Sequence, residues 1–274
     1  MTIHTALQQG RRLLEDGGIA APRLTAEVLL AHALQRERVY LYSHPEEELG
    51  RIGWIHFGRY LHERLQGKPT QYITGVQEFY GREFRVRPGV FIPRPETEHL
   101  IETALRLAPR AERILDAACG SGAIAVTLSL EMKQAVWATD LSDDALAATR
   151  ENAVRLGAAV HLVRADFAEP FASNSLDLLV SNPPYIPEHE KEGLPREVRD
   201  YEPHLALFGG VEGLDPYRAL IAQARRLLRP GGRAVFEIGY QQAEAVRSLF
   251  EGWCDVEIVA DLAGLPRVAT ARMG

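Results

Sequence analysis

The spacing of apolar and polar positions changes character along this chain of 274 residues. Over residues 1–66, apolar side chains recur three and four positions apart, as Leu29, Leu30 and Leu34 illustrate, and this spacing is typical of helices with one buried face. Three glutamates after His44-Pro45 suit the start of a further helix. The first 66 residues are therefore expected to form a small helical bundle, which contains no glycine loop or catalytic-looking cluster.

The stretch from 67 to 94 is rich in turn residues and short apolar runs. It predicts a β-hairpin that turns at Gly81-Arg82, followed by a short strand at 90–92. Residues 93–98 then open a helix, because proline fits a first helical turn and glutamate complements the positive helix end. Residues 67–94 are interpreted as a linker between the bundle and a catalytic domain at 95–274.

From residue 113 onward, short apolar runs alternate with helical segments, which is typical of an α/β fold. Strands are expected at 114–116, 136–140, 160–163, 176–180, 234–238, 256–259 and 267–271. A helix at 217–228 is predicted to stop at Pro230-Gly231-Gly232. The pattern indicates an open α/β sheet that binds ligands at the carboxyl ends of its strands.

Composition narrows the possible partners. The formal net charge is −6, which argues against direct binding of long nucleic acid. Two cysteines, Cys119 and Cys254, allow no disulfide framework or zinc pattern, so a reducing cytoplasm is expected, and no metal site is predicted. No apolar run approaches the roughly 20 residues that cross a bilayer, and the N-terminus has no leader pattern, so no membrane association is expected.

Three successive strand ends carry residues suited to a nucleoside ligand. The first is a glycine turn of small residues that lets a ligand approach the backbone closely; its members are Ala118, Cys119, Gly120, Ser121 and Gly122. Asp140 follows Gly120 by 20 residues, a placement that suits a ribose hydroxyl. Asp166 can accept from an adenine amino group, and Phe167 can lie against the base. This layout fits either an NAD-like cofactor or S-adenosylmethionine.

The fourth strand end carries Asn182-Pro183-Pro184-Tyr185. Two prolines hold the chain extended and supply no N–H, so carbonyl groups can point outward beside the Asn182 amide and the Tyr185 ring. Such an arrangement could grip a planar group that carries an NH2. By itself, however, the tetrapeptide is equally consistent with a simple strand stop.

Taken together, the glycine turn, Asp140, Asp166 and Asn182-Pro183-Pro184-Tyr185 resemble a class I S-adenosylmethionine-dependent methyltransferase. The segments 72–75, 91–98 and 201–214 further resemble the HemK/PrmC family of peptide chain release factor glutamine methyltransferases. This resemblance covers nearly the whole chain. It implies a Rossmann-like, mostly parallel seven-stranded sheet with an N-terminal helical bundle and a β-hairpin linker. One departure is Ala118, where the family more often has glycine.

The resemblance implies methyl transfer from S-adenosylmethionine to the glutamine of the Gly-Gly-Gln motif in class I release factors. Asn182 and Pro183 would accept the two N–H bonds of that glutamine, and the Tyr185 ring would stack on its amide plane. These three residues and Pro184 would bind the substrate. The cofactor would be held by the glycine turn, Asp140, Asp166, Phe167 and Asn182. Glu237, at the end of the fifth expected strand, is interpreted as structural.

Other hypotheses remain open from the residues alone. The tetrapeptide also suits N6-adenine methylation of nucleic acid, although the negative charge argues against it. A ribosomal-protein glutamine methyltransferase shares the tetrapeptide but lacks the Pro-Glu-Thr-Glu ending at 95–98. A non-catalytic module that binds the cofactor or docks a protein is the third alternative. The release factor hypothesis has the helical bundle docking the substrate, and the protein acting as a monomer.

Overall fold

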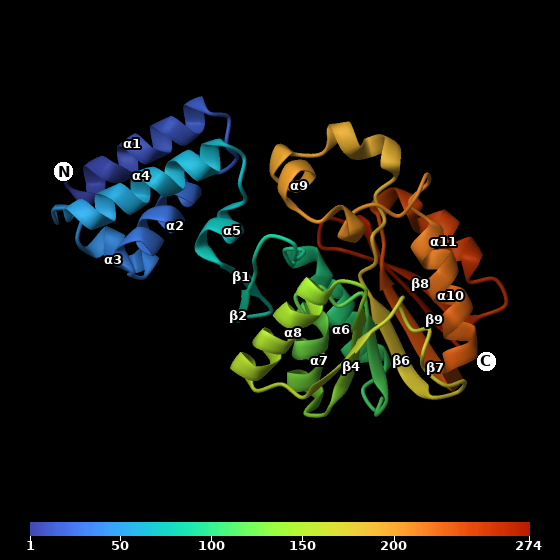
Figure 1. The fold of residues 1–274 in the computed structure, drawn as a ribbon. Coiled ribbons are helices and arrows are strands. Elements are labelled where there is room, and N and C mark those ends of the chain that lie inside the picture. The colour runs from blue at the N-terminus through green and yellow to red at the C-terminus, as the bar shows by residue number, and fades with distance from the viewer. The chain divides into compact units, whose positions relative to one another are not determined.

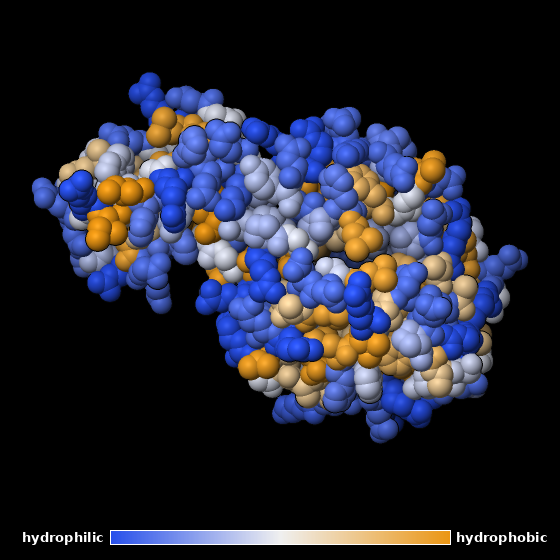
Figure 2. Space-filling model, viewed as in Figure 1, coloured by the Kyte–Doolittle hydropathy of each residue, from blue (hydrophilic) through white to orange (hydrophobic).

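The computed structural model describes residues 1–274, which divide into two compact units. One unit consists of Met1–Val76 together with Pro195–Tyr201. The other consists of Gln77–Leu194 together with Glu202–Gly274. None of the helices is both long enough and apolar enough to cross a membrane. The face drawn in Figure 2 is mostly hydrophilic, and its apolar residues lie in small patches.

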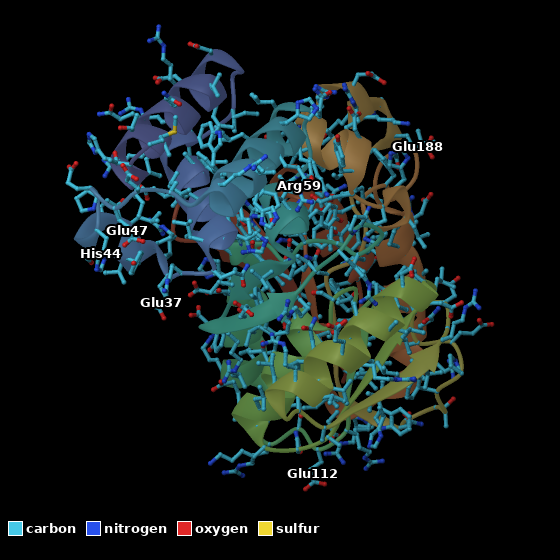
Figure 3. The ribbon with its side chains drawn as sticks, turned by 60° about the vertical axis from the view of Figure 1, so that its left-hand side comes forward. Glu37, His44, Glu47, Arg59, Glu112 and Glu188 are labelled. Carbon is cyan, nitrogen blue, oxygen red and sulfur yellow. The ribbon has the colours of Figure 1, made fainter.

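The first unit is a helical bundle, as the sequence pattern predicts. Its helices are α1 (Ile3–Asp16), α2 (Pro22–Leu34), α3 (Arg38–Ser43), α4 (Arg51–Leu65), α5 (Thr70–Thr74) and α9 (Arg196–Tyr201) (Figure 1). Leu14, Leu30 and Phe57 are fully buried in its core. Charged side chains such as Glu37 and Glu47 project from the surface (Figure 3). The bundle thus buries the apolar stripe that its spacing defines.

The second unit is built on a mostly parallel seven-stranded sheet, which confirms the expected fold class. Its strands are β3 (Ile114–Ala117), β4 (Val136–Asp140), β5 (Val160–Arg164), β6 (Leu176–Ser181), β7 (Leu228–Glu237), β8 (Cys254–Ala260) and β9 (Pro266–Arg272). They lie in the order β5-β4-β3-β6-β7-β9-β8, and β9 runs antiparallel to both of its neighbours. The chain leaves β3 toward β4 and β5, then returns to place β6 on the other side of β3. A ligand is expected at this reversal of direction.

Helices cover both faces of the sheet (Figure 1). One face packs against α6 (Glu98–Leu107), α7 (Ala123–Met132) and α8 (Asp143–Leu156), and the other against α10 (Asp215–Leu227) and α11 (Ala243–Leu249). Neighbouring strand residues alternate between these two cores. Leu178 joins the first core and Leu179 the second, because successive side chains of a strand point to opposite faces. The central strands β3 and β6 are therefore buried on both faces and mostly apolar, with Asp116 and Asp177 as their charged exceptions.

A two-stranded hairpin precedes the sheet, formed by β1 (Val76–Phe79) and β2 (Arg82–Arg85). The prediction of a hairpin is confirmed, but its turn is one residue earlier than expected, at Tyr80-Gly81, where both residues have positive φ. Asn152 of α8 fastens the end of β2. Its Oδ1 accepts from the Arg85 N–H at 2.8 Å, and its Nδ2 donates to the Arg85 carbonyl at 3.0 Å.

Three local predictions are wrong. The glutamates after Pro45 do not start a helix, because α4 begins only at Arg51 and its first turn contains no acidic residue. No strand forms at 90–92, because the N–H of Val90 closes a turn on Arg87 and that of Ile92 donates to the Glu202 carboxylate at 3.1 Å. Pro230-Gly231-Gly232 does not terminate the preceding helix, which already ends at Leu227. The three residues form an irregularity inside β7, where pairing with β6 shifts between Leu176 and Leu178. Gly231 supplies the positive φ of 83° that this irregularity requires.

Candidate active site

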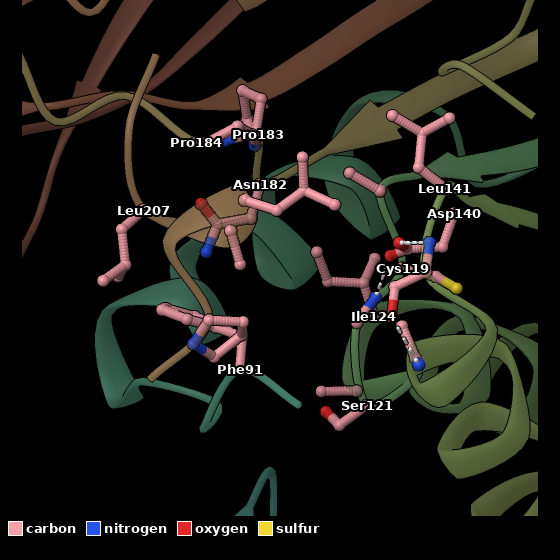
Figure 4. A pocket seen from close by; sticks show the side chains of 18 of the residues that line it. Phe91, Cys119, Ser121, Ile124, Asp140, Leu141, Asn182, Pro183, Pro184 and Leu207 are labelled. Atoms are coloured by element: carbon pink, nitrogen blue, oxygen red, sulfur yellow. Dashed lines mark hydrogen bonds between the residues drawn. The ribbon is translucent and has the colours of Figure 1, made fainter. Parts of the chain in front are cut away.

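A pocket opens at the carboxyl ends of β3, β4, β5 and β6, at the reversal of strand order. Its lining includes nearly all of the residues that the sequence singles out, which lie far apart in the chain (Figure 4). These are Ala118, Cys119, Gly120, Ser121, Asp140, Asp166, Phe167, Asn182, Pro183, Pro184 and Tyr185. Phe91, Pro93, Thr97, Leu205 and Leu207 also line it. The pocket is therefore an apolar cavity with a few polar groups, as small-molecule sites usually are.

The glycine turn follows β3 and forms one wall of the pocket. Ala118, Gly120 and Gly122 all have positive φ, at 62°, 56° and 82°. A Cβ added at Gly120 would meet only the Cβ of Phe91, at 3.9 Å, so this glycine leaves open space on the pocket side. Gly122 does not line the pocket: a Cβ there would approach Thr149 of α8 to 2.7 Å. Gly120 thus admits a ligand, whereas Gly122 allows close packing of the turn on α8.

Asp140 joins the ends of two strands at the pocket. Its Oδ2 accepts from the Gly120 N–H and its Oδ1 from the Ser142 N–H, both at 2.9 Å. Burial raises the pKa of Asp140, and these backbone hydrogen bonds oppose the rise. Each carboxylate oxygen retains a further lone pair, so Asp140 can hold the turn and still accept from a ligand hydroxyl.

The next strand end supplies Asp166 and Phe167, both of which line the pocket. Phe167 has a positive φ of 49°, which is uncommon for an aromatic residue. Together with Ile124 and Leu141 it gives this part of the pocket an apolar surface beside the Asp166 carboxylate. The combination suits a flat heteroaromatic ring that carries a hydrogen-bond donor.

Asn182-Pro183-Pro184-Tyr185 leaves β6 at the pocket and presents acceptors to it. The side-chain Nδ2 of Asn182 donates to the Thr97 hydroxyl at 3.1 Å, and no group of the protein donates to its Oδ1. The Pro183 carbonyl likewise has no donor within the chain. The loop itself is fixed, because Gln242 Nε2 donates to the Tyr185 carbonyl at 2.9 Å and Ile186 pairs with the segment at Phe208. Two acceptors therefore remain for a ligand.

Two buried residues beside the pocket, Thr97 and Glu237, form a contact that the sequence did not predict. Thr97 lies at the end of η1 (Pro95–Thr97), and its hydroxyl donates to Glu237 Oε2 at 2.6 Å. Burial raises the pKa of Glu237 to about 7, although the Thr97 hydrogen bond and the charge of Arg267 lower it. The sequence could have drawn attention to these residues only by their positions: Thr97 follows Pro95 at the start of a helix, and Glu237 ends a buried strand. Their mutual contact spans 140 residues and cannot be read from either segment.

The rim of the pocket is held by a buried carboxylate. Glu202 is 4% exposed, forms an ion pair with Arg94 and accepts from the Ile92 N–H at 3.1 Å. The Arg94 guanidinium lies 4.8 Å from the centre of the Phe91 ring, a cation–π contact. Glu202 therefore connects the loop after Asn182-Pro183-Pro184-Tyr185 with the segment that carries Phe91.

Asp116, two residues before the glycine turn, is not among the residues that line the pocket. It is fully buried on β3, and its Oδ2 accepts from the Ala125 N–H at 3.0 Å. Burial raises the pKa of Asp116 well above its ordinary value. Asp116 thus holds the first turn of α7 against the sheet and does not line the pocket.

This sheet, with a pocket at its strand ends that is lined by the glycine turn, Asp140, Asp166 and Asn-Pro-Pro-Tyr, defines a class I S-adenosylmethionine-dependent methyltransferase. Residues 5–75 match the family described as PrmC N-terminal domain, and residues 82–196 match the methyltransferase small domain. Release factor glutamine methyltransferases from Koribacter versatilis and Nitratidesulfovibrio vulgaris are 44% and 46% identical to the chain. The alignments cover 99% of this chain in both cases, and 99% and 95% of the relatives. The chain belongs to the release factor glutamine methyltransferase family.

Solved structures agree on the fold. A methyltransferase from Pyrococcus furiosus superposes with a TM-score of 0.55 at 16% identity, over 71% of this chain and 90% of that one. The Thermus thermophilus 16S rRNA N2 G1207 methyltransferase, solved with AdoMet and guanosine, gives a TM-score of 0.53 at 21% identity, over 73% and 50%. At these identities the likeness establishes the shared sheet architecture alone.

Proposed function

We propose that the protein transfers the methyl group of S-adenosylmethionine to the side-chain amide of the glutamine in the Gly-Gly-Gln motif of class I release factors. The observation that carries this proposal is the pair of unengaged acceptors, Asn182 Oδ1 and the Pro183 carbonyl, on two residues that line the pocket at the strand ends. An amide NH2 offers two N–H bonds to such a pair. The full-length relatives named for this activity support the same substrate.

The residues present fit the cofactor. Asp140 offers acceptor oxygens for the ribose hydroxyls. The open space at Gly120 lets the cofactor approach the backbone of the glycine turn closely. Phe167 offers a ring face to the adenine. Bound S-adenosylmethionine supplies an already activated methyl group. The main task of the protein is therefore to hold the acceptor nitrogen in line with that group.

Asn182 and Pro183 perform this positioning. A glutamine amide is a weak nucleophile because its nitrogen lone pair is delocalised into the carbonyl. Two acceptors on its N–H bonds fix the rotation of the NH2 group and favour pyramidalisation at nitrogen. The Tyr185 ring lines the pocket beside them and can stack on the amide plane. No strong base is needed before transfer, and the surplus proton leaves to water afterwards.

The helical unit is proposed to dock the release factor, with residues 67–94 as the connection to the catalytic domain at 95–274. Its helix α4 exposes Ile52 and Ile55, whose side chains are 71% and 55% accessible, and exposed apolar groups of this kind mark protein contact sites when clustered. With a release factor as its substrate, we expect the protein in the cytoplasm, where the free cysteines Cys119 and Cys254 would remain reduced. We expect a monomer, which sedimentation velocity would test.

The direct test incubates the purified protein with a bacterial class I release factor and methyl-labelled S-adenosylmethionine. Mass spectrometry of the Gly-Gly-Gln peptide is expected to show one added methyl group on the glutamine. A release factor with glutamate or alanine at that position serves as the control and should remain unlabelled. Label on DNA, RNA or a ribosomal protein, with none on the release factor, would overturn the proposal.

A further inference from the structure

A buried row of hydrogen bonds joins three side chains beside the pocket. Thr97 Oγ1 lies 2.6 Å from Glu237 Oε2 and 3.1 Å from Asn182 Nδ2. Thr97 and Glu237 are 3% and 1% exposed, so water does not compete for these groups. The three residues come from the end of η1, the end of β7 and the loop after β6, and only the tertiary fold brings them together.

The charge state of Glu237 decides the direction of these hydrogen bonds. A carboxylate can only accept, so Thr97 must give its single hydroxyl proton to Glu237. The Thr97 oxygen is then left as an acceptor, and the donor that it meets is Asn182 Nδ2. The Asn182 side chain therefore turns its oxygen toward the pocket, where it can accept from a substrate N–H.

The second oxygen of the same carboxylate contacts the other side chain of the tetrapeptide. Tyr185 donates its hydroxyl to Glu237 Oε1 at 3.4 Å. Burial raises the pKa of Tyr185, which keeps the phenol protonated and able to donate. One buried acid thus contacts Tyr185 directly and Asn182 through Thr97.

We propose that Glu237 is a positioning residue for methyl transfer: through Thr97 it keeps Asn182 presenting an acceptor to the substrate NH2, and it holds the Tyr185 hydroxyl. The proposal rests on the proposed function, because an acceptor is required only if the bound group donates. It also gives a role to a buried acid that has no ion-pair partner in direct contact. An asparagine amide alone could present either its oxygen or its NH2, and the latter would repel the substrate NH2.

The test compares isosteric variants. Glu237→Gln can donate from its amide to Thr97, which frees the Thr97 proton for Asn182 Oδ1 and lets the Asn182 NH2 turn toward the pocket. Thr97→Val removes the connecting hydroxyl altogether, whereas Thr97→Ser retains it. We expect kcat for release factor methylation to fall about 10- to 100-fold in Glu237→Gln and Thr97→Val, as for other small misplacements of reacting groups.

The accompanying readouts separate positioning from a structural role. The dissociation constant for S-adenosylhomocysteine, measured by calorimetry, should stay at its wild-type value in both slow variants, and the release factor KM should change less than kcat. Thr97→Ser should restore kcat. Thr127→Val is the matched control, since Thr127 is also a fully buried threonine but its hydroxyl has no partner. It should be as active as the wild type.

Each contrary result has a distinct meaning. Wild-type kcat in Glu237→Gln or Thr97→Val would overturn the positioning role while leaving the proposed function intact. Loss of cofactor binding in parallel with kcat, or failure of Thr97→Ser to restore activity, would also overturn it in favour of a structural role. A wild-type protein that methylates no release factor would overturn both proposals together.

Discussion

The side-chain amide of Asn182 donates to the hydroxyl of Thr97 at 3.1 Å, across a separation of 85 residues in the chain. This contact uses the donor half of the amide inside the protein and leaves its acceptor half for the pocket. The chemistry expected from Asn-Pro-Pro-Tyr therefore depends on a residue outside that tetrapeptide.

Replacing Asn182 tests the acceptor directly. Asn182→Ala removes the oxygen and should lower kcat by about 100-fold or more, the usual cost of losing one preorganised polar contact to the reacting group. Calorimetry with S-adenosylhomocysteine should show cofactor binding largely unchanged, because Asp140 and the glycine turn are untouched. Equal losses of cofactor affinity and of kcat would contradict this assignment.

Replacing Ala118 tests backbone strain in the glycine turn. Ala118 has a φ of 62°, a conformation that costs a residue with a Cβ about 1–2 kcal/mol in the folded state. Glycine would remove this cost, but its greater freedom in the unfolded chain would lower the stability by about 0.5–1 kcal/mol. Ala118→Gly should therefore raise the free energy of unfolding by up to about 1 kcal/mol, measured by urea denaturation.

A matched control separates strain from cofactor contact. Lys133 caps α7 with a φ of 54° and lies outside the pocket. Lys133→Gly should stabilise the protein to a similar extent without altering the affinity for S-adenosylmethionine. Ala118→Gly is expected to tighten that affinity, because the removed methyl group lines the pocket. A loss of stability in Ala118→Gly would show that the turn is not strained.

The buried Glu237 makes stability depend on pH. Its pKa is about 7 in the folded protein against an ordinary value of 4.5, so between these values the folded state binds more protons than the unfolded state. The free energy of unfolding should therefore fall by about 3 kcal/mol as the pH rises from 4.5 to 7, and this contribution should be level above that range. Glu237→Gln should lose this pH dependence of the free energy of unfolding, and at pH 8 the variant should be more stable than the wild type.

The activity, unlike the stability, should increase with pH if Glu237 acts as a carboxylate. Wild-type kcat should rise as the pH passes through about 7, whereas Glu237→Gln should remain slow without that rise. The groups that face the carboxyl are Arg267 of β9, which favours the charged form, Glu96, which opposes it, and the hydroxyls of Thr97 and Tyr185. A pH profile of kcat with the same shape in wild type and variant would contradict this prediction.

The ion pair at the pocket rim supports a fifth prediction. Glu202→Gln removes the charge that pairs with Arg94, and should lower the free energy of unfolding by about 1–3 kcal/mol, since Glu202 is buried and Arg94 only partly so. Cofactor affinity should also weaken, because Phe91 would lose its fixed position against Arg94. Glu212→Gln is the control: its pair with Arg218 is exposed to solvent, so the substitution should leave the free energy of unfolding nearly unchanged.

Local patterns in the sequence account for most of the fold. The helical bundle, the alternating strands and helices, and the hairpin all follow from periodicity and turn residues, because these signals act within about ten residues. The predictions of local structure failed where a residue distant in the sequence forms a hydrogen bond with the segment, or where a strand is irregular. The Glu202 carboxylate takes the Ile92 N–H that a strand would use, and Pro230-Gly231-Gly232 is accommodated inside β7 by a shift in pairing.

The features of the candidate site likewise fall into those that the sequence predicts and those that only the tertiary structure sets. The sequence by itself determined which residues stand at four successive strand ends, and parallel strands necessarily bring their carboxyl ends to one edge of the sheet. It did not determine which way the Asn182 amide faces or that Thr97 connects Asn182 to Glu237. Those features depend on contacts across 85 and 140 residues, and only packing of η1 and β7 against the β6 loop decides them. Burial then sets the proton affinity of Glu237, a property that no local pattern encodes.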